Sequence, residues 1–297
     1  MINFHGLCKK SKFFEGWYFK HQIGDETIAF IPSISIDENG HRAAHLQIIT
    51  NTGSYHIEYC YSQFRVNRNR LEIQIGNNFF SNKGIRLDIR SSKFTCTGTI
   101  RYGQFTPILY DIMGVFSVFP FMECNHGIIS LYHTLTGEIL INNKSTKFTG
   151  GVGYIEKDWG SSFPKRYTWV QSNDFSIKRC CIFASVADIP FLGFTFQGCI
   201  CVVYYKGREY RFATYNGAKV LRCDGKLLVI KQGRYLLTIK TDGKDAHALY
   251  APSQGGMTRT IHENNSCTAH FVLKEGNHIV FDLYSKNTGF EFVGVKT

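Results

Sequence analysis

Carboxylic acids set among aromatic residues are the clearest candidates for chemistry in this chain. Glu156 and Asp158 stand beside Trp159, and Glu15 lies in a second aromatic stretch, 13–20. Burial pushes a carboxyl group toward its neutral form, which is the form that a general acid needs at neutral pH. The faces of aromatic rings are partially negative and can stabilise a carbocation. These residues therefore predict acid chemistry on an apolar, electron-rich substrate.

The spacing of the two acids in the second motif adds a geometric expectation. In an extended strand, side chains alternate between faces, so Glu156 and Asp158 share one face and Lys157 points to the other. Two carboxylates on one buried face do not both ionise easily, so one of them would hold a proton near neutral pH. The alternative is that these acids pair with Lys157, Lys165 or Arg166 and only fix a loop. The sequence leaves both interpretations open.

Other common catalytic and binding signatures do not match. Gly150, Gly151 and Gly153 lack the G-x-G-x-x-G spacing of a nucleotide-binding loop, and they favour a bulge or close backbone packing instead. No G-x-S-x-G motif marks a serine nucleophile. The histidines are dispersed and none forms a trio with metal-ligand spacing, so we expect no metal site.

Period-two alternation of apolar and polar residues recurs along the whole chain and predicts an all-β protein. The clearest runs are 55–61, 71–75, 85–90 and 279–284. Turn-forming pairs such as Asn39-Gly40 and Asp242-Gly243 lie between such runs. Amphipathic periodicity of the helical kind does not extend beyond two or three turns. The high aromatic share, 15%, suits strands around an apolar interior.

The order of the expected strands repeats once. The segment that starts at Trp17 and leads into 28–34 resembles the segment that starts at Trp169 and leads into 181–186. We therefore expect an internal duplication, with an N-terminal domain at 1–160 and a C-terminal domain at 161–297. Each half has the size of a lipocalin-like β-barrel or sandwich, a fold that can enclose a small apolar ligand.

The net charge of +11 has two interpretations. One is an ordinary lysine-rich soluble surface, and the other is attraction to an anionic surface. Within the second, a membrane is favoured over nucleic acid, because the basic residues are scattered and match no nucleic-acid-binding motif. We expect no secretory signal and no transmembrane helix. Ten cysteines without C-x-x-C spacing suggest free thiols in a reducing compartment, so the expected location is the cytoplasm, with peripheral contact at the inner membrane face.

One segment departs from the strand pattern. Residues 105–124 contain no basic residue, and their only charges are Asp111 and Glu123. The segment is either a buried crossover between strands or an apolar lip around Phe116, Phe119 and Phe121 that faces a ligand or a membrane. Together with the basic net charge, such a lip would support reversible docking on an anionic membrane surface.

Several separated motifs, in order along nearly the whole chain, resemble the tocopherol cyclase family, which is similar to lipocalin-like carotenoid hydratases. They are Phe14-Glu-Gly-Trp-Tyr-Phe19, Pro120-Phe-Met-Glu-Cys-Asn-His-Gly-Ile-Ile-Ser130, Glu156-Lys-Asp-Trp-Gly160, Phe163-Pro-Lys-Arg-Tyr-Thr-Trp169, Gln171-Ser-Asn173, Ala251-Pro-Ser253 and Phe290-Glu-Phe-Val-Gly294. Two positions depart from the plant pattern: Asp158 replaces an asparagine, and Ser172 replaces a cysteine. An added carboxylate beside Glu156 would raise the pKa of one of the pair.

The resemblance implies a cyclase that adds a phenolic hydroxyl across a prenyl double bond to give a chromanol, without redox cofactor or metal. The catalytic residues would be Glu156, Asp158 and Glu15. The residues expected to contact the apolar prenylated substrate are Trp17, Tyr18, Phe121, Met122, His126, Trp159, Trp169, Gln171 and Asn173. The alternative, equally consistent with the aromatic composition, is a lipocalin-like carrier or sensor that binds isoprenoid lipids without catalysis. No nucleic-acid partner is expected.

Overall fold

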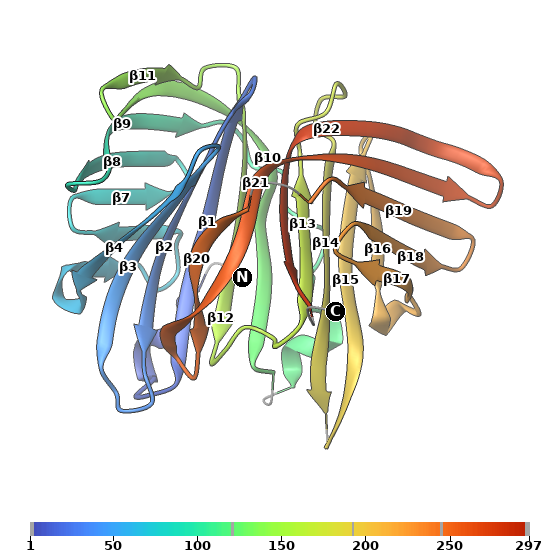
Figure 1. The fold of residues 1–297 in the computed structure, drawn as a ribbon, viewed down its shortest axis with the longest axis horizontal. Coiled ribbons are helices and arrows are strands. Elements are labelled where there is room, and N and C mark those ends of the chain that lie inside the picture. Colours follow the sequence, from blue (N-terminus) through green and yellow to red (C-terminus); the bar gives the residue numbers. More distant parts are fainter. Residues whose placement is uncertain (1–2, 120–121, 192, 244–245, 295–297) are drawn as a thin grey trace. The chain divides into compact units, whose positions relative to one another are not determined.

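The computed structural model describes residues 3–119, 122–191, 193–243 and 246–294 (Figure 1). Its secondary structure is β-strand with four short 3₁₀ helices in the described residues, which confirms the all-β prediction. The period-two runs become strands because alternate side chains enter a hydrophobic core. In the run 71–75, for example, Leu71, Ile73 and Ile75 are all buried.

The chain forms two compact units, and neither is a continuous half of the sequence. The N-terminal unit comprises Met1–Ile108, Glu123–Phe163 and Leu249–Thr260, and the C-terminal unit comprises Leu109–Met122, Pro164–Ala248 and Ile261–Thr297. Two segments, 109–122 and 249–260, therefore belong to the unit of the opposite half. The domain limits 1–160 and 161–297 stay a prediction.

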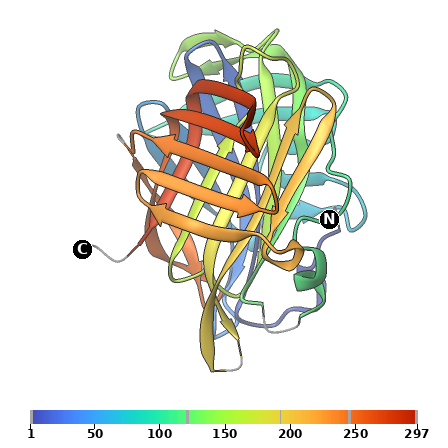
Figure 2. The same ribbon diagram turned by 90° about the vertical axis from the view of Figure 1, so that its right-hand side faces the viewer.

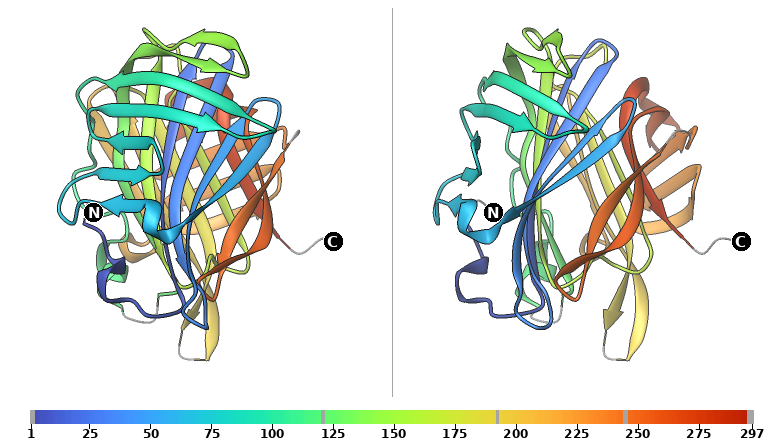
Figure 3. Two further views of the ribbon diagram at one scale, coloured as in Figure 1. Left: turned by 90° about the vertical axis from the view of Figure 1, so that its left-hand side faces the viewer. Right: turned by 60° about the vertical axis from the view of Figure 1, so that its left-hand side comes forward.

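The N-terminal unit is built on one antiparallel sheet in the order β4-β3-β2-β1-β12-β10-β9-β8-β7-β6-β5, with β11 paired to β10 (Figures 1 and 3). Among the described strands, no ladder joins β4 to β5, so the sheet is open. The elements are η1 (Gly6–Cys8), β1 (Phe13–Ile23), β2 (Glu26–Ile36), β3 (Arg42–Thr50), β4 (Ser54–Cys60), η2 (Tyr61–Gln63), β5 (Phe64–Val66), β6 (Glu72–Ile75), β7 (Asn78–Ser81), β8 (Gly84–Arg90), β9 (Thr95–Tyr102), β10 (Cys124–Ile141), β11 (Lys144–Lys147) and β12 (Val152–Gly160).

The second sheet has the order β16-β15-β14-β13-β22-β21-β19-β18-β17, with β20 paired to β21 (Figures 1 and 2). Its elements, with two 3₁₀ helices, are η3 (Gly114–Val118), β13 (Tyr167–Ser172), β14 (Cys181–Phe191), β15 (Phe194–Tyr205), β16 (Arg208–Ala213), η4 (Thr214–Asn216), β17 (Lys219–Asp224), β18 (Leu227–Gln232), β19 (Tyr235–Thr241), β20 (His247–Ser253), β21 (Gly256–Glu275) and β22 (His278–Val293). Of these, most of β20 and the start of β21 lie in the segment 249–260, which belongs to the N-terminal unit.

The two sheets, of 12 and 10 strands, share the order of their central strands, which agrees with the expected duplication. In each, the first strand lies between the second strand and the last: β2-β1-β12 in one sheet and β14-β13-β22 in the other. The alignment of Trp17 with Trp169, however, is displaced by one residue. Trp17 belongs to the hydrophobic core of its unit, whereas on β13 it is Val170 that enters the core. Because side chains alternate along a strand, a shift of one residue moves a side chain to the other face.

Each sheet encloses its own hydrophobic core, and the N-terminal core also contains polar groups. His21 and His133 are fully buried, and Nε2 of His21 lies 2.6 Å from the hydroxyl of Tyr102. His133 occupies the space that a side chain at Gly153 would need, since a Cβ there would lie 2.2 Å from Nε2 of His133. The expected close packing at this glycine is therefore present. Burial lowers the pKa of His21 to about 3 and places that of His133 well below its usual value.

Acidification is expected to destabilise the protein through these buried histidines. The pKa of His21 in the folded state is below the usual 6.5, so its contribution to stability is complete above pH 6.5 and is lost as the pH falls toward 3. Such a histidine costs up to about 1.4 kcal/mol per pH unit in that window. Urea unfolding between pH 7 and 4.5 should therefore show a shallower pH slope for His21→Gln. His41→Gln, whose side chain is 82% exposed, should keep the wild-type slope; equal slopes in all three proteins would contradict the assignment.

Candidate functional site

The acidic motif lies on β12, the strand that pairs with β1 on one side and with β10 on the other (Figure 1). The strand is regular here, so Glu156 and Asp158 share a face and Lys157 points to the opposite one. Glu156 is buried, with 3% of its surface exposed, and the Asp158 side chain is 24% exposed. The spatial separation of Lys157 from these two acids agrees with the expectation from period two.

The residue that meets both acids is His126 of β10. Its backbone is directly opposite Asp158 in the β10–β12 ladder. Its Nδ1 lies 2.7 Å from Oδ1 of Asp158, and its Nε2 lies 3.4 Å from Oε2 of Glu156. The imidazole is itself buried, so it is held between two carboxylates with little access to water. We call His126, Glu156 and Asp158 the acid triad.

The electrostatics of the acid triad place a proton on the imidazole. Burial by itself would lower the pKa of His126, but the charges of Asp158 and then Glu156, with the hydrogen bonds that the imidazole donates to both, outweigh it and raise the pKa to about 10. At neutral pH His126 is therefore an imidazolium between two acids. The expectation that a carboxyl group of the pair holds a proton stays a prediction, and His126 adds a second group that can carry one.

Two tyrosines surround Glu156 on this face. The hydroxyl of Tyr154 donates a hydrogen bond of 2.5 Å to Oε2 of Glu156, and Tyr18 of β1 lies opposite Glu156 in the β1–β12 ladder. Cys124 of β10 approaches Asp158, with its sulfur 4.0 Å from Oδ1. Burial and then the charge of Asp158 raise the pKa of this thiol well above its usual range, so it is protonated and is a poor nucleophile.

The opposite face of β12 carries a different group, which includes three of the expected site residues, Glu15, Trp17 and Trp159. Nζ of Lys157 lies 2.7 Å from Oε1 of Glu15, and both side chains are fully buried. The ammonium group also lies over the rings of Trp17 and Trp159, at 5.6 and 4.9 Å from their centroids. His5 completes the group: its imidazole stacks on Trp159.

This arrangement separates Glu15 from the acid triad. Glu15, Trp17 and Trp159 project from the face of the sheet opposite to Glu156, whereas Tyr18 and His126 project from the same face. The catalytic role expected for Glu15 stays a prediction, and its contacts identify it as the partner of Lys157.

The remaining expected substrate contacts among the described residues belong to the C-terminal unit. Trp169 and Gln171 lie on β13 and are buried, as is Asn173 directly after the strand. Met122 is half-buried, and Phe121 lies outside the described residues. Their roles in substrate binding stay predictions.

Sequence reasoning missed a second acidic pair, which lies on β21 and β22 of the other sheet. Glu291 of β22 lies opposite Trp169 of β13 and opposite Glu263 of β21, and both acids are buried. The hydroxyl of Tyr167 donates a 2.6 Å hydrogen bond to Oε2 of Glu291. The signal in the sequence was the motif that contains Glu291, which the family resemblance had already marked.

The acid triad also has the chemistry of a cation site. In the part of the chain that the structure describes, ligand atoms of His126, Glu156 and Asp158 lie within 4.8 Å of one another. Spacing along the sequence did not reveal this group because His126 is on a different strand from the two acids. A metal would have to displace the proton of an imidazolium whose pKa is about 10, which opposes binding at neutral pH.

Comparison with solved structures supports the fold. The chain superimposes on CghA in complex with Sch210972 with a TM-score of 0.58 at 8% identity, over 94% of this chain and 88% of that one. It superimposes on kievitone hydratase from Nectria haematococca with a TM-score of 0.54 at 13% identity, over 98% and 93%. At such identities the likeness shows a shared two-sheet fold. No helix in the described residues has the length and hydropathy needed to cross a membrane.

Comparison of sequences gives the family. A "Probable tocopherol cyclase, chloroplastic" of Oryza sativa subsp. japonica is 25% identical over 266 residues, which cover 69% of this chain and 57% of the relative. The "Tocopherol cyclase, chloroplastic" of Zea mays is 24% identical over 69% of this chain and 56% of its own length. The chain thus spans little more than half the length of these curated relatives. The model of the family described as tocopherol cyclase-like matches residues 88–294. Because this match covers well over half of the chain, the protein belongs to the tocopherol cyclase-like family.

Proposed function

We propose that the protein is an enzyme that cyclises a prenylated phenol or quinol by acid catalysis, adding the phenol oxygen across a prenyl double bond to form a chromanol. The observation that carries this proposal is the protonated imidazole of His126 held between Glu156 and Asp158 on a buried sheet face. Membership of the tocopherol cyclase-like family supports the same reaction class.

The acid triad suits a reaction that passes through a cation. With His126 protonated, the triad holds a proton that it can transfer. Transfer of a proton from the triad to the alkene carbon forms a C–H bond and leaves a tertiary carbocation on the substrate. The triad is then more negative by one charge, so its attraction for the cation is greatest when the cation is present. Stabilisation that grows along the reaction coordinate lowers the barrier.

The second half of the reaction returns the proton. The phenol oxygen attacks the tertiary carbon, a C–O bond forms, and the hydroxyl proton passes to the triad. No atom is gained or lost by the substrate, and the triad ends in its starting state. Tyr154, whose hydroxyl donates to Glu156, holds that carboxylate in position through both proton transfers. Single variants of the three triad residues identify the proton donor: the variant in which proton transfer to the alkene is lost marks the residue that faces the alkene.

The test is turnover of a panel of prenylated quinols that differ in chain length and ring methylation. The purified protein should convert at least one of them to a chromanol of equal mass and different retention on reversed-phase chromatography. Exchange should place one solvent deuterium on carbon when the reaction is run in D₂O, because the proton comes from the solvent-equilibrated triad. A protein that binds these quinols and releases them unchanged would instead be the carrier that the aromatic composition also suits, and the enzymatic proposal would be wrong.

A further inference from the structure

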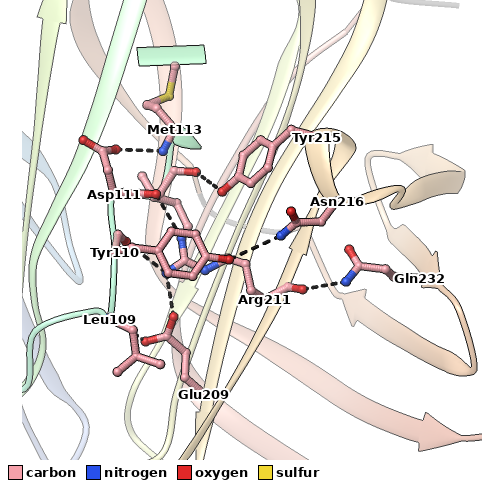
Figure 4. A network of polar contacts seen from close by, with 10 residues as sticks. Leu109, Tyr110, Asp111, Met113, Glu209, Arg211, Tyr215, Asn216 and Gln232 are labelled. Atoms are coloured by element: carbon pink, nitrogen blue, oxygen red, sulfur yellow. Dashed lines mark hydrogen bonds and ion pairs between the residues drawn. The ribbon is translucent and has the colours of Figure 1, made fainter. Parts of the chain in front are cut away.

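The segment 109–122 is fastened to the C-terminal unit by a buried ion pair (Figure 4). Arg211 and Glu209 of β16 lie 2.5 Å apart, with side chains only 6% and 3% exposed. Glu209 accepts a hydrogen bond from the backbone N–H of Leu109, and Arg211 donates to the carbonyl oxygens of Tyr110 and Asp111. The guanidinium group also lies over the ring of Tyr110, 4.1 Å from its centroid. The backbone before η3 is therefore held at several points.

The next residues are fixed by aromatic packing. Tyr215 of η4 donates a hydrogen bond to the carbonyl oxygen of Ile112, and its ring lies against Gly114. Gly114 has a φ of +51°, and a Cβ at this position would lie 2.5 Å from the ring of Tyr215. Phe116 then packs against Tyr215 and against Phe196 of β15. Phe116 and Phe119, expected to form an exposed lip, are consequently half-buried.

What remains exposed is a set of other apolar side chains. Val115 and Val118 of η3 are 57% and 75% exposed, Leu109 is 79% exposed, and Phe194 at the start of β15 is 56% exposed. The contact between Phe116 and Phe196 joins η3 to the β14–β15 hairpin, which extends beyond the neighbouring strands of its sheet (Figures 1 and 2). We call Val115, Val118 and Phe194 the η3–hairpin surface. Apolar side chains that are exposed to water on one part of the surface mark an interaction site.

The overall charge of +11 favours an anionic partner. Residues 112–122 and 189–205 contain no charged side chain. Charged residues of both signs lie at the margin: Asp111 and Glu123 flank the first segment, and Lys165 and Lys219 are exposed. Asp188 and Glu209 are paired with Arg166 and Arg211. An uncharged apolar centre on a basic protein is a pattern of a peripheral membrane surface.

We propose that the η3–hairpin surface docks the protein on an anionic phospholipid bilayer, with Val115, Val118 and Phe194 entering the headgroup region. The inference goes beyond the proposed reaction and does not depend on it, because it rests on contacts within the C-terminal unit. It identifies the docking residues as those beside the expected phenylalanine lip and adds a hairpin that the sequence had not marked.

Flotation with phosphatidylcholine vesicles that contain about one third phosphatidylglycerol tests the proposal. The wild-type protein should float with these vesicles, should float less with pure phosphatidylcholine, and should be partly released by salt. Val118→Glu and Phe194→Glu should each lower the vesicle partition coefficient by about tenfold or more, since each removes apolar contact and adds a repelled charge. Ile279→Glu is the matched control, because Ile279 is 50% exposed on β22 of the same unit.

The outcomes separate clearly. Loss of binding in the two surface variants with binding retained in Ile279→Glu would support the proposal, provided that all three variants keep the wild-type circular dichroism and melting temperature. Equal binding by all variants would overturn it, and so would a wild-type protein that ignores both kinds of vesicle. A wild-type dimer in size-exclusion chromatography that Phe194→Glu dissociates, without vesicle binding, would assign the surface to a second copy of the chain and would also overturn the membrane proposal.

Discussion

Glu156→Gln should lower the rate of chromanol formation by about three orders of magnitude while leaving the fold intact. The substitution keeps the size of the side chain and its contact with Tyr154, but it removes one of the two negative charges around His126. General acid–base catalysis accelerates a reaction roughly 10²- to 10⁴-fold, and the charge of Glu156 also stabilises the developing cation. The expected loss is in kcat, with KM little changed, because the charge matters most in the transition state. Single-turnover kinetics on a converted quinol measures it.

A matched control is available in the C-terminal unit. His270 and Asp282 form another histidine–aspartate contact, with 2.7 Å between Nε2 and Oδ1, but the Asp282 side chain is 51% exposed. Asp282→Asn should therefore leave kcat unchanged. If Glu156→Gln lost less than about threefold, the triad would not be the proton source, since a general acid contributes far more than that.

Asp158→Asn tests the acid triad through the pH dependence of the rate of chromanol formation. The charge of Asp158 is the largest contribution that raises the pKa of His126 to about 10. Because the acid must be protonated to act, the wild-type rate should fall only as the pH rises through that value. Asp158→Asn removes the charge, so the alkaline fall in rate should move to lower pH. A profile that does not move would separate His126 from the proton transfer.

Lys157→Ala and Glu15→Ala should each lower the free energy of unfolding by about 3–5 kcal/mol. Both side chains are fully buried and lie 2.7 Å apart, so removal of either one leaves a buried charge without its counter-ion. The double variant Glu15→Leu with Lys157→Met should regain most of this loss, because an apolar pair of similar volume carries no desolvation penalty. Urea unfolding monitored by tryptophan fluorescence and by circular dichroism measures all four proteins.

The exposed pair Lys144–Glu26 is the control for this effect. Its side chains are 75% and 52% exposed, so Lys144→Ala should change stability by less than about 1 kcal/mol. The double variant also separates the two roles considered for Glu15. If it is stable and still forms chromanol at the wild-type rate, Glu15 holds Lys157 and is not a catalytic acid. Single variants that cost no more than Lys144→Ala would show that the buried pair does not stabilise the fold.

Much of the architecture could be predicted from local sequence pattern. Period two is a property of a single strand, so the alternation of Glu156, Lys157 and Asp158 was sufficient to separate the lysine from the two acids. The same property located most strands and the repeated order that became two sheets with the same order of central strands. An exception is Ile279, which the alternation assigned to the core side and which is half-exposed near the start of β22.

The local sequence pattern did not predict the register between strands. Alignment of Trp17 with Trp169 matched the residue type but not the face of the sheet, since Trp17 enters the core of its unit and on β13 Val170 does so. A one-residue error in aligning two strands changes a sequence comparison very little, but it assigns every side chain of the strand to the wrong face of the sheet. The buried pair of Glu263 and Glu291 became visible only through the register of β21 and β22.

By itself, the sequence determined the β class, the duplication, the family resemblance and the two acids of the candidate site, because each depends on residues close together in the chain. Tertiary structure decided that His126 joins those acids, from a strand some 30 residues earlier, through the β10–β12 ladder. It also decided that Glu15 neutralises Lys157 and that 109–122 packs on the C-terminal unit. The pKa of a histidine depends on burial and on charges a few ångströms away, and neither quantity exists until distant strands are brought together.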